Sequence, residues 1–231
     1  MSLNLEHCLR IARQIARESG TLMLTAFHLP KKVEFKGRTD LVTETDKKIE
    51  EYVCAQLKAY FPSHKFLGEE TMAALQAAGK PAIEELTSEP TWVVDPVDGT
   101  TNFVHSIPYS CVSIALVVEH EAVLGVVFNP VSGEMFTAIK GQGAFRNDAP
   151  ISVSDNQELV QAVVATGIPH DKSYLREFVQ GNLQTIQTHC QSQLSPSLFL
   201  RPFPLHPFAL LREMCKFLIR SFFFVFSLFF V

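Results

Sequence analysis

This chain of 231 residues has no excess of basic charge, no C-x-x-C pair of cysteines and no long apolar run in its opening residues. The formal net charge is −4, whereas a nucleic-acid-binding protein would show a strong basic excess. The five cysteines stand without C-x-x-C spacing, and the opening residues, MSLNLEHCLRIARQ, lack the apolar run of a signal peptide. These absences argue against nucleic acid as a partner and predict a cytoplasmic protein in a reducing compartment.

Two amphipathic helices are predicted in the first part of the chain, whose length suits one large domain or two small ones. From Leu3 to Phe27, apolar residues recur at the i, i+3, i+4 spacing of a helix with one buried face. A second helix is predicted in TETDKKIEEYVCAQLKAYFP, where Thr43 stands three residues before Asp46 as in a capping box, and it ends before Pro62.

The residues around and after these helices predict an α+β fold. A loop that holds Pro30 and Gly37 is expected between the helices. HKFLGEE reads as a short strand that ends on two glutamates, and TMAALQAAGK as a helix or lid. Further strands are rich in Val, Ile and Phe and separated by turn residues, as in an antiparallel sheet. They are Trp92–Asp95, SCVSIALVVE, AVLGVVFNP, GEMFTAIKGQGAF and AVVATGIPHD, with one more helix in YLREFVQGNLQTIQTHC.

The composition changes sharply over residues 194–231. This segment holds ten of the nineteen phenylalanines and has no Gly, Asn or Asp. Its last fifteen residues, FLIRSFFFVFSLFFV, suggest a membrane anchor. A span needs about 20 apolar residues, however, and the chain has only eleven residues after Arg220. We therefore favour an aberrant or alternative terminus, of the kind that translation through a pyrimidine tract would give, over a tail anchor.

Four carboxylates stand at two predicted strand ends, Glu69 and Glu70 on one segment and Asp95 and Asp98 on another. Clustered carboxylates repel one another unless a cation lies between them. Oxygen ligands of this kind select Mg²⁺, Mn²⁺ or Ca²⁺ rather than zinc. The pattern therefore predicts a site for a hard divalent cation.

The stretch DPVDGTT, residues 95–101, adds features of a phosphate site. Pro96 restricts one backbone angle, so the turn can present both aspartates and the Val97 carbonyl to the same side. Gly99 and Thr100 open a predicted helix whose amide N–H groups suit a phosphate. DPVDG alone fits a plain turn about equally well. The longer string WVVDPVDGTTNF with GEE upstream favours a metal-assisted phosphate-ester hydrolase.

Three motifs carry a resemblance to a known family: DLVTETD at 40–46, LGEE at 67–70 and WVVDPVDGTTNFVHSIPYSCVSIAL at 92–116. From about Leu3 to Thr188 the chain resembles the inositol monophosphatase family rather than the fructose-bisphosphatase or bisphosphate-nucleotidase branches. The resemblance implies an αβαβα sandwich that usually forms a homodimer. It also implies a phosphoric monoester hydrolase that uses Mg²⁺, is inhibited by lithium, and converts inositol monophosphate, a sugar-like small molecule, to myo-inositol and phosphate.

The same resemblance implies metal ligands. Glu69 is expected to bind the first metal and to help hold the attacking water. Asp95 is expected to bridge two metals, the Val97 carbonyl to complete the shell of the first, and Asp98 to bind the second. One ion would lower the pKa of a bound water and the other would stabilise the departing alkoxide, without a covalent enzyme intermediate.

Catalytic and substrate contacts are implied as well. The Thr100 hydroxyl, paired with Asp46, is expected to help Glu69 activate the water, and the amides of Gly99 and Thr100 to bind the phosphate. The implied substrate-binding residues are Glu69, Val97, Asp98, Gly99 and Thr100.

The resemblance also implies a second half that is expected after about Gln193 and does not appear. It would bring an Arg-rich strand, a G-S-A-A-L-like helix start and a Trp-Asp pair that completes the second metal site. The chain is thus expected to comprise a metal-binding half at 1–150, the start of an α/β half at 151–193 and the tail at 194–231. We expect it to be an impaired and unstable enzyme. The alternatives are an inactive isoform that binds intact subunits through the family dimer surface, and a membrane-anchored form.

Other residues near the motifs have competing interpretations. We favour a structural hydrogen-bonding role for His105 over metal binding, because the site is all-oxygen. Lys36 fits a family lysine at the mouth of the site and a plain loop lysine equally. Glu70 is expected to be buried behind the ligands rather than exposed. Cys54 and Cys111 are expected to be core thiols rather than nucleophiles, because no His/Asp arrangement accompanies them.

Overall fold

The structure is a computed structural model that describes residues 3–36, 40–79 and 87–152. Residues Met1–Pro150 form one compact unit, and Ile151–Val231 are assigned to a second. The strand expected in AVVATGIPHD, the helix expected in YLREFVQGNLQTIQTHC and the Phe-rich tail lie outside the described residues.

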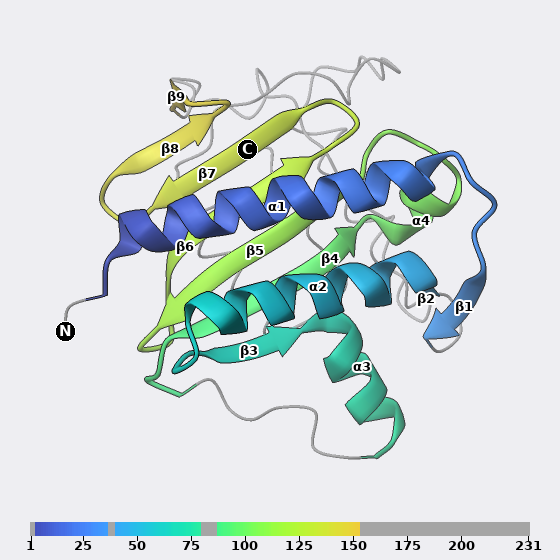
Figure 1. Ribbon diagram of the computed structural model, residues 1–231, viewed down its shortest axis with the longest axis horizontal. Helices are drawn as coiled ribbons and strands as arrows, with labels where there is room; N and C mark the ends of the chain where they lie inside the picture. The colour runs from blue at the N-terminus through green and yellow to red at the C-terminus, as the bar shows by residue number, and fades with distance from the viewer. Residues whose placement is uncertain (1–2, 37–39, 80–86, 153–231) are drawn as a thin grey trace, which may run out of the picture. The chain divides into compact units, whose positions relative to one another are not determined.

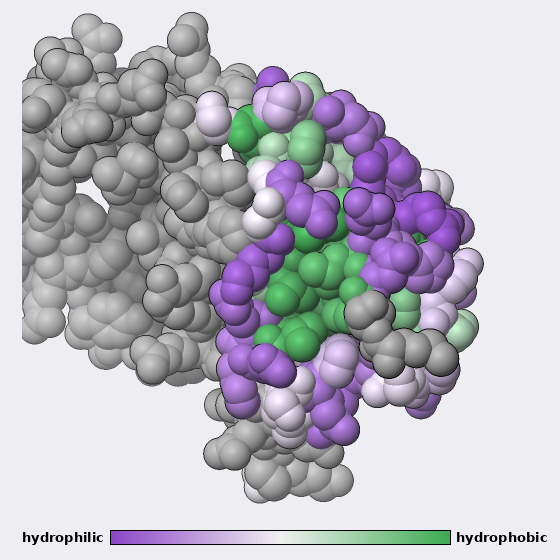
Figure 2. Space-filling model, turned by 90° about the vertical axis from the view of Figure 1, so that its left-hand side faces the viewer, coloured by the Kyte–Doolittle hydropathy of each residue, from purple (hydrophilic) through white to green (hydrophobic). Residues whose placement is uncertain are grey.

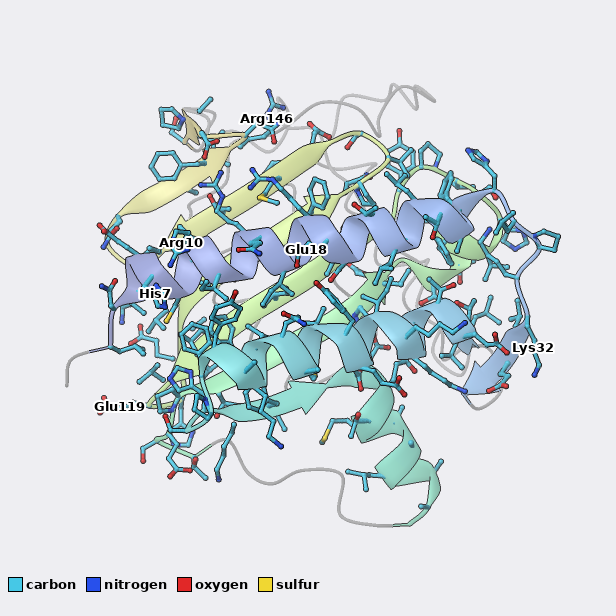
Figure 3. All side chains as sticks on the ribbon, viewed as in Figure 1. His7, Arg10, Glu18, Lys32, Glu119 and Arg146 are labelled. Carbon is cyan, nitrogen blue, oxygen red and sulfur yellow. The ribbon has the colours of Figure 1, made fainter. Side chains whose placement is uncertain are left out.

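Both predicted amphipathic helices are confirmed. Helix α1 (Leu5–Phe27) and helix α2 (Glu44–Tyr60) run antiparallel across one face of the sheet (Figure 1). The Asn4 side chain accepts a hydrogen bond from the backbone of His7 and so caps α1. Between the helices, the Tyr52 hydroxyl of α2 donates to Glu18 of α1 at 2.5 Å, and Figure 3 marks Glu18 on α1.

A mixed sheet of seven strands lies under the helices, in the order β3-β4-β5-β6-β7-β8-β9. Its strands from β4 to β8 pair antiparallel, as expected, but β3 lies parallel to β4. The reason is the connection between them: residues 69–90, which include a helix, are long enough for the crossover that parallel strands need. The strand bounds are β3 Lys65–Gly68, β4 Thr91–Asp98, β5 Cys111–Val118, β6 Glu121–Asn129, β7 Glu134–Ile139, β8 Gly143–Arg146 and β9 Ala149–Ile151.

The main core lies between the two helices and the sheet. Ile15 of α1 and Val53 of α2 are fully buried against the central strands, where Trp92, Ile114 and Leu116 are also fully buried. Each such side chain contributes about 1.5–3 kcal/mol to folding. The first half of β4, from Thr91 to Asp95, pairs with β5 in regular register, which carries the last residues of β4 to a defined place.

The loop expected between the helices contains a two-stranded hairpin, β1 (Val33–Lys36) and β2 (Asp40–Thr43), which is a correction to the sequence-based expectation. Four-residue strands give too short an alternation to be recognised from sequence. Two short helices follow strand ends: α3 (Glu69–Ala77) begins directly after β3, and α4 (Thr100–Val104) begins two residues after β4.

The surface where α1 begins and α2 ends carries an apolar area rimmed by hydrophilic residues (Figure 2). Tyr60, the last residue of α2, is 46% exposed.

Within the described ranges, no helix combines the length and the hydropathy needed to cross a membrane.

Candidate active site

A β-bulge at the end of β4 brings Asp95 and Asp98 to the same face of the sheet. Side chains three apart on a regular strand point to opposite faces. Here Asp95 lies opposite Ser113 and Asp98 opposite Cys111, so three steps on β4 match two on β5. Pro96, which has no N–H to give to a sheet ladder, stands inside this irregular segment. The spacing D-P-V-D is therefore what places both carboxylates on one face.

Glu69 lies beside these aspartates because β3 is parallel to β4. Gly68, the last residue of β3, pairs with Val94, and Asp95 is the next residue along β4. Glu69 follows Gly68 at the same level and is the first residue of α3. Glu69 and Asp95 are both buried, with 9% and 6% of their surfaces exposed. The two predicted carboxylate segments thus meet at one edge of the sheet.

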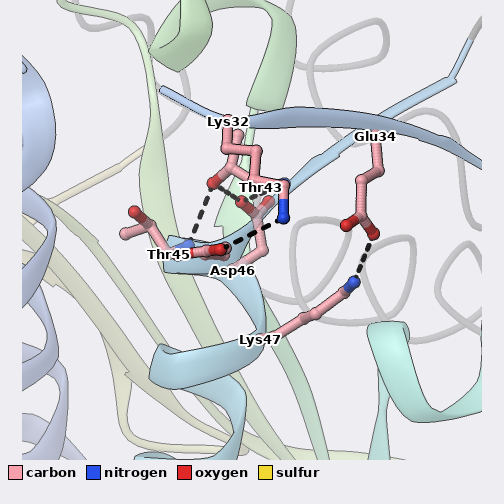
Figure 4. Close-up of polar contacts among 7 residues, drawn as sticks. Lys32, Glu34, Thr43, Thr45, Asp46 and Lys47 are labelled. Atoms are coloured by element: carbon pink, nitrogen blue, oxygen red, sulfur yellow. Dashed lines mark hydrogen bonds and ion pairs between the residues drawn. The ribbon is translucent and has the colours of Figure 1, made fainter. Parts of the chain in front are cut away.

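Asp46 connects the start of α2 to the start of α4. Its carboxylate accepts a hydrogen bond from the backbone N–H of Thr43, which is one half of the predicted capping box, and another from the Thr43 hydroxyl (Figure 4). Its other oxygen accepts from the Thr100 hydroxyl at 3.2 Å, and that hydroxyl also lies 3.0 Å from the Val97 carbonyl. Asp46 is fully buried. The structure therefore brings Asp46 next to Thr100 and Val97, which lie about fifty residues later in the sequence.

Gly99 is the hinge between β4 and α4. Its φ of +84° is left-handed, and a Cβ there would lie 2.7 Å from the Tyr109 carbonyl, so conformation and space both require glycine. The helix that it opens has five residues and no side-chain cap. The predicted helix start is confirmed, although the helix is short. The Gly99 amide donates to the Asp98 carboxylate.

The electrostatics at Asp98 are unfavourable for a bare carboxylate. Burial raises the pKa of the Asp98 carboxyl to about 7, and the neighbouring negative charge of Glu69 adds to the rise. The Cys111 thiol donates to Asp98 at 3.5 Å, and burial, reinforced by Asp98, raises the pKa of that thiol well above its usual value. A cation beside these carboxylates would favour their charged forms.

Three residues that the sequence did not single out for the site take part in it or border it. The Thr43 hydroxyl donates to Asp46, and the capping-box pattern already hinted at this contact. The carboxylate of Glu50 accepts from the first turn of α3. Ser113, fully buried opposite Asp95, has a hydroxyl that finds no hydrogen-bond partner within the described part of the chain. For Glu50 and Ser113 the sequence carries no local signal, because both act across elements.

The structure also shows the surroundings of the residues near the motifs that had competing interpretations. The His105 side chain is exposed, and its backbone N–H ends α4. Glu70 is buried, as expected, with 8% of its surface exposed. Burial raises the pKa of Cys54 to about 12 and that of Cys111 well above its usual value, which favours the thiol form of both. The Lys36 side chain lies outside the described part of the structure.

Comparison with known proteins identifies the family. The model of the inositol monophosphatase family matches residues 4–196. The chain belongs to the inositol monophosphatase family. Inositol monophosphatase 3 of Solanum lycopersicum is 50% identical over 171 residues, which are 73% of this chain and 62% of that protein. The chain thus spans somewhat under two thirds of the length of this curated relative.

Solved structures of similar proteins share the fold. The extragenic suppressor protein suhB of Bartonella henselae is 31% identical with a TM-score of 0.68, covering 80% of this chain and 68% of that one. A LiCl-soaked inhibitory complex of Staphylococcal inositol monophosphatase-1 is 25% identical with a TM-score of 0.61, covering 72% of this chain and 60% of that one. The α+β sandwich expected from the sequence is thereby confirmed.

Inositol monophosphatases need a metal ion, and the local chemistry of this chain fits one. Asp95 and Asp98 share one face of the sheet, and the negative charge of Glu69 repels that of Asp98. The buried Ser113 hydroxyl, which has no hydrogen-bond partner among the described residues, lies opposite Asp95, as it would beside a bound water or ion. Among the described residues, however, no three His, Cys, Asp or Glu side chains converge on one point as ligands do. The donors fit Mg²⁺ in kind, and the ligand set stays a prediction.

Proposed function

We propose that this protein hydrolyses inositol monophosphate to myo-inositol and phosphate, with Mg²⁺ as cofactor and water as the direct nucleophile. The observation that carries the proposal is the bulge in β4, which turns Asp95 and Asp98 to one face beside Glu69. A turn without a site would not need to gather three buried or partly buried carboxylates at the cost of mutual repulsion.

In this proposal Glu69, Asp95, Asp98 and the Val97 carbonyl hold Mg²⁺. Bound there, the metal would lower the pKa of a water and neutralise charge on the phosphate. The proposal assigns Glu69 a second task, holding the attacking water, and it places substrate contacts on Glu69, Val97 and Asp98 as well. Hard oxygen donors of this kind suit Mg²⁺.

Thr100 and Asp46 would orient the water. The Thr100 hydroxyl lies within hydrogen-bonding distance of the Asp46 carboxylate and of the Val97 carbonyl. With the Val97 carbonyl bound to the metal, the hydroxyl would donate its hydrogen bond to Asp46. The lone pairs of the Thr100 hydroxyl are then able to accept a hydrogen bond from the attacking water. We further propose that the Gly99 and Thr100 amides contact the phosphate. The lack of a side-chain cap at the start of α4 supports this for Thr100. The Gly99 amide donates to the Asp98 carboxylate here, so its phosphate contact rests on the resemblance to the family.

The proposal extends to properties that are expected from the family. These are a homodimer, a cytoplasmic location, and inhibition by lithium, which is supported by the LiCl-soaked inhibitory complex of the Staphylococcal relative. It retains the division into a metal-binding unit at 1–150, a second unit from 151 and a distinct segment from 194. It also retains impaired turnover by the chain as given, with the inactive, subunit-binding isoform as the alternative.

The test is phosphate release from inositol 1-phosphate by the full chain during a Mg²⁺ titration. Asp95→Asn should lower kcat/KM by at least about a hundredfold, because it removes a ligand carboxylate. Asp148→Asn is the matched control: the residue is exposed on the β8–β9 turn with φ +68°, which asparagine tolerates. Equal rates for the two variants would contradict the proposal. Binding to an intact family subunit without turnover would support the inactive isoform.

A further inference from the structure

Helix α3 begins without a cap of its own. The residue before it is Gly68, which has no side chain to accept the first backbone N–H groups of the helix. The first turn of any helix leaves such donors unpaired, and burying them without acceptors is costly. Glu69 is the first residue of this turn, and Glu70 behind it is buried. An acceptor must therefore come from elsewhere in the fold.

Glu50, from the middle of α2, supplies that acceptor. Its Oε2 accepts the Glu70 N–H at 2.7 Å, and its Oε1 accepts the Thr71 N–H at 2.9 Å and the Thr71 hydroxyl at 2.5 Å. Only 4% of Glu50 is exposed. Burial raises the pKa of its carboxyl, and these three hydrogen bonds oppose the rise. A carboxylate at a helix start is also favoured by the helix dipole.

The glycine at 68 is what admits this carboxylate. A Cβ at position 68 would lie 2.3 Å from the carboxyl carbon of Glu50, and 2.5 and 2.6 Å from its oxygens. Gly68 does not have a left-handed φ, so its backbone conformation is open to other residues. Glycine is needed here for space, and the space is filled by Glu50.

Both oxygens of Glu50 are thus committed to α3, which makes Glu50 a poor candidate for a metal ligand itself. Its contacts act on the neighbouring residue instead. Glu69 stands between Gly68, which is paired with Val94 in the sheet, and Glu70, which is held by Glu50. The backbone of Glu69 is therefore fixed on both sides.

We propose that Glu50 is a positioning residue, which fixes the first turn of α3 and thereby sets the Glu69 carboxylate beside Asp95 and Asp98 for the divalent cation. The inference rests on the proposed function, because it takes Glu69 as a metal ligand. It assigns to one buried glutamate the task of holding another carboxylate against the repulsion of its neighbours.

The experiment compares Glu50→Gln with Glu51→Gln in the full chain. Glu51 is the exposed next residue of α2, so the chemical change is the same without the contact. An amide side chain retains one acceptor and turns an N–H donor toward the helix start. We expect faster hydrogen exchange at the Glu70 and Thr71 amides, measured by NMR, in Glu50→Gln only. We also expect its affinity for Mg²⁺ alone, measured by calorimetry, to fall about tenfold.

Gly68→Ala approaches the same contact from the other side and guards against a folding artefact of the first variant. It should weaken Mg²⁺ binding and speed exchange at the same two amides. Unchanged exchange in Glu50→Gln would overturn the anchoring of α3. Faster exchange with Mg²⁺ affinity equal to that of Glu51→Gln would show a structural cap without a positioning role. If the unchanged protein binds no Mg²⁺, the proposed function fails and so does the positioning role, while the exchange data still decide whether Glu50 anchors α3.

Discussion

The first backbone N–H groups of α2 and of α3 find their hydrogen-bond acceptors in two different ways. At α2, Thr43 and Asp46 lie three residues apart and cap the helix to which they belong. At α3, Gly68 has no side chain to accept a hydrogen bond, and the acceptor is Glu50 of α2, which lies twenty residues before Glu70. Asp46 and Glu50 are one turn apart on α2, and both are buried. The comparison teaches that one helix face organises both the Thr100 side and the Glu69 side of the candidate site.

The largest effect is expected from Glu50→Ala, which removes the remote cap altogether. A buried amide, a partly buried amide and a partly buried hydroxyl would lose their acceptor, so the free energy of unfolding should fall by about 3 kcal/mol. Urea unfolding of the full chain measures this loss. Glu51→Ala, the exposed control, should change the free energy of unfolding by less than about 0.5 kcal/mol. If Glu50→Ala lowered the free energy of unfolding no more than Glu51→Ala does, Glu50 would not act as the cap of α3.

Gly68→Ala should cost about 2 kcal/mol, because the added methyl group competes with the Glu50 carboxylate for space. The same change in a Glu50→Ala background should cost almost nothing, since the space is then vacant. A double-mutant cycle by urea unfolding gives the coupling. Additive costs would mean that the glycine serves some purpose other than admitting Glu50.

Thr43→Ala tests the local cap and should cost about 1 kcal/mol, as is usual for the loss of an N-cap side chain. Thr43→Ser keeps the hydroxyl and should stay close to the unchanged protein in the same unfolding experiment. If Thr43→Ala were more costly than Glu50→Ala, the local cap would be the stronger of the two.

Thr100→Val should have the smallest effect on stability, about 0.5 kcal/mol, because its hydroxyl lies in a partly buried position. Its effect on phosphate release should be much larger, about a hundredfold in kcat, if the hydroxyl helps to orient the attacking water. Thr101→Val, at the exposed neighbouring position, is the control for both measurements. A drop in activity no larger than that of the control would remove Thr100 from the proposed mechanism.

Much of the local structure could be predicted from the sequence because the signals lie within a few residues of one another. The apolar periodicity of α1 and α2, the Thr43–Asp46 capping box and the strands β5, β6 and β7 were of this kind. The motif around Asp95 also identified the family, since its residue types and spacing are rarely met by chance. The roles assigned to the site residues remain predictions.

What the sequence by itself determined is therefore the two long helices, most strands of the large sheet and the chemical character of the carboxylate cluster, because periodicity and residue type act over short distances. Only the tertiary structure decided how the cluster is assembled. The parallel pairing of β3 with β4 brings Glu69 level with Asp95, and the bulge against β5 turns Asp98 to the same face. Glu50 reaches α3 only because Gly68 leaves room for it. Glu50, Glu69 and the two aspartates come from three separate parts of the chain, and the fold alone brings these parts together.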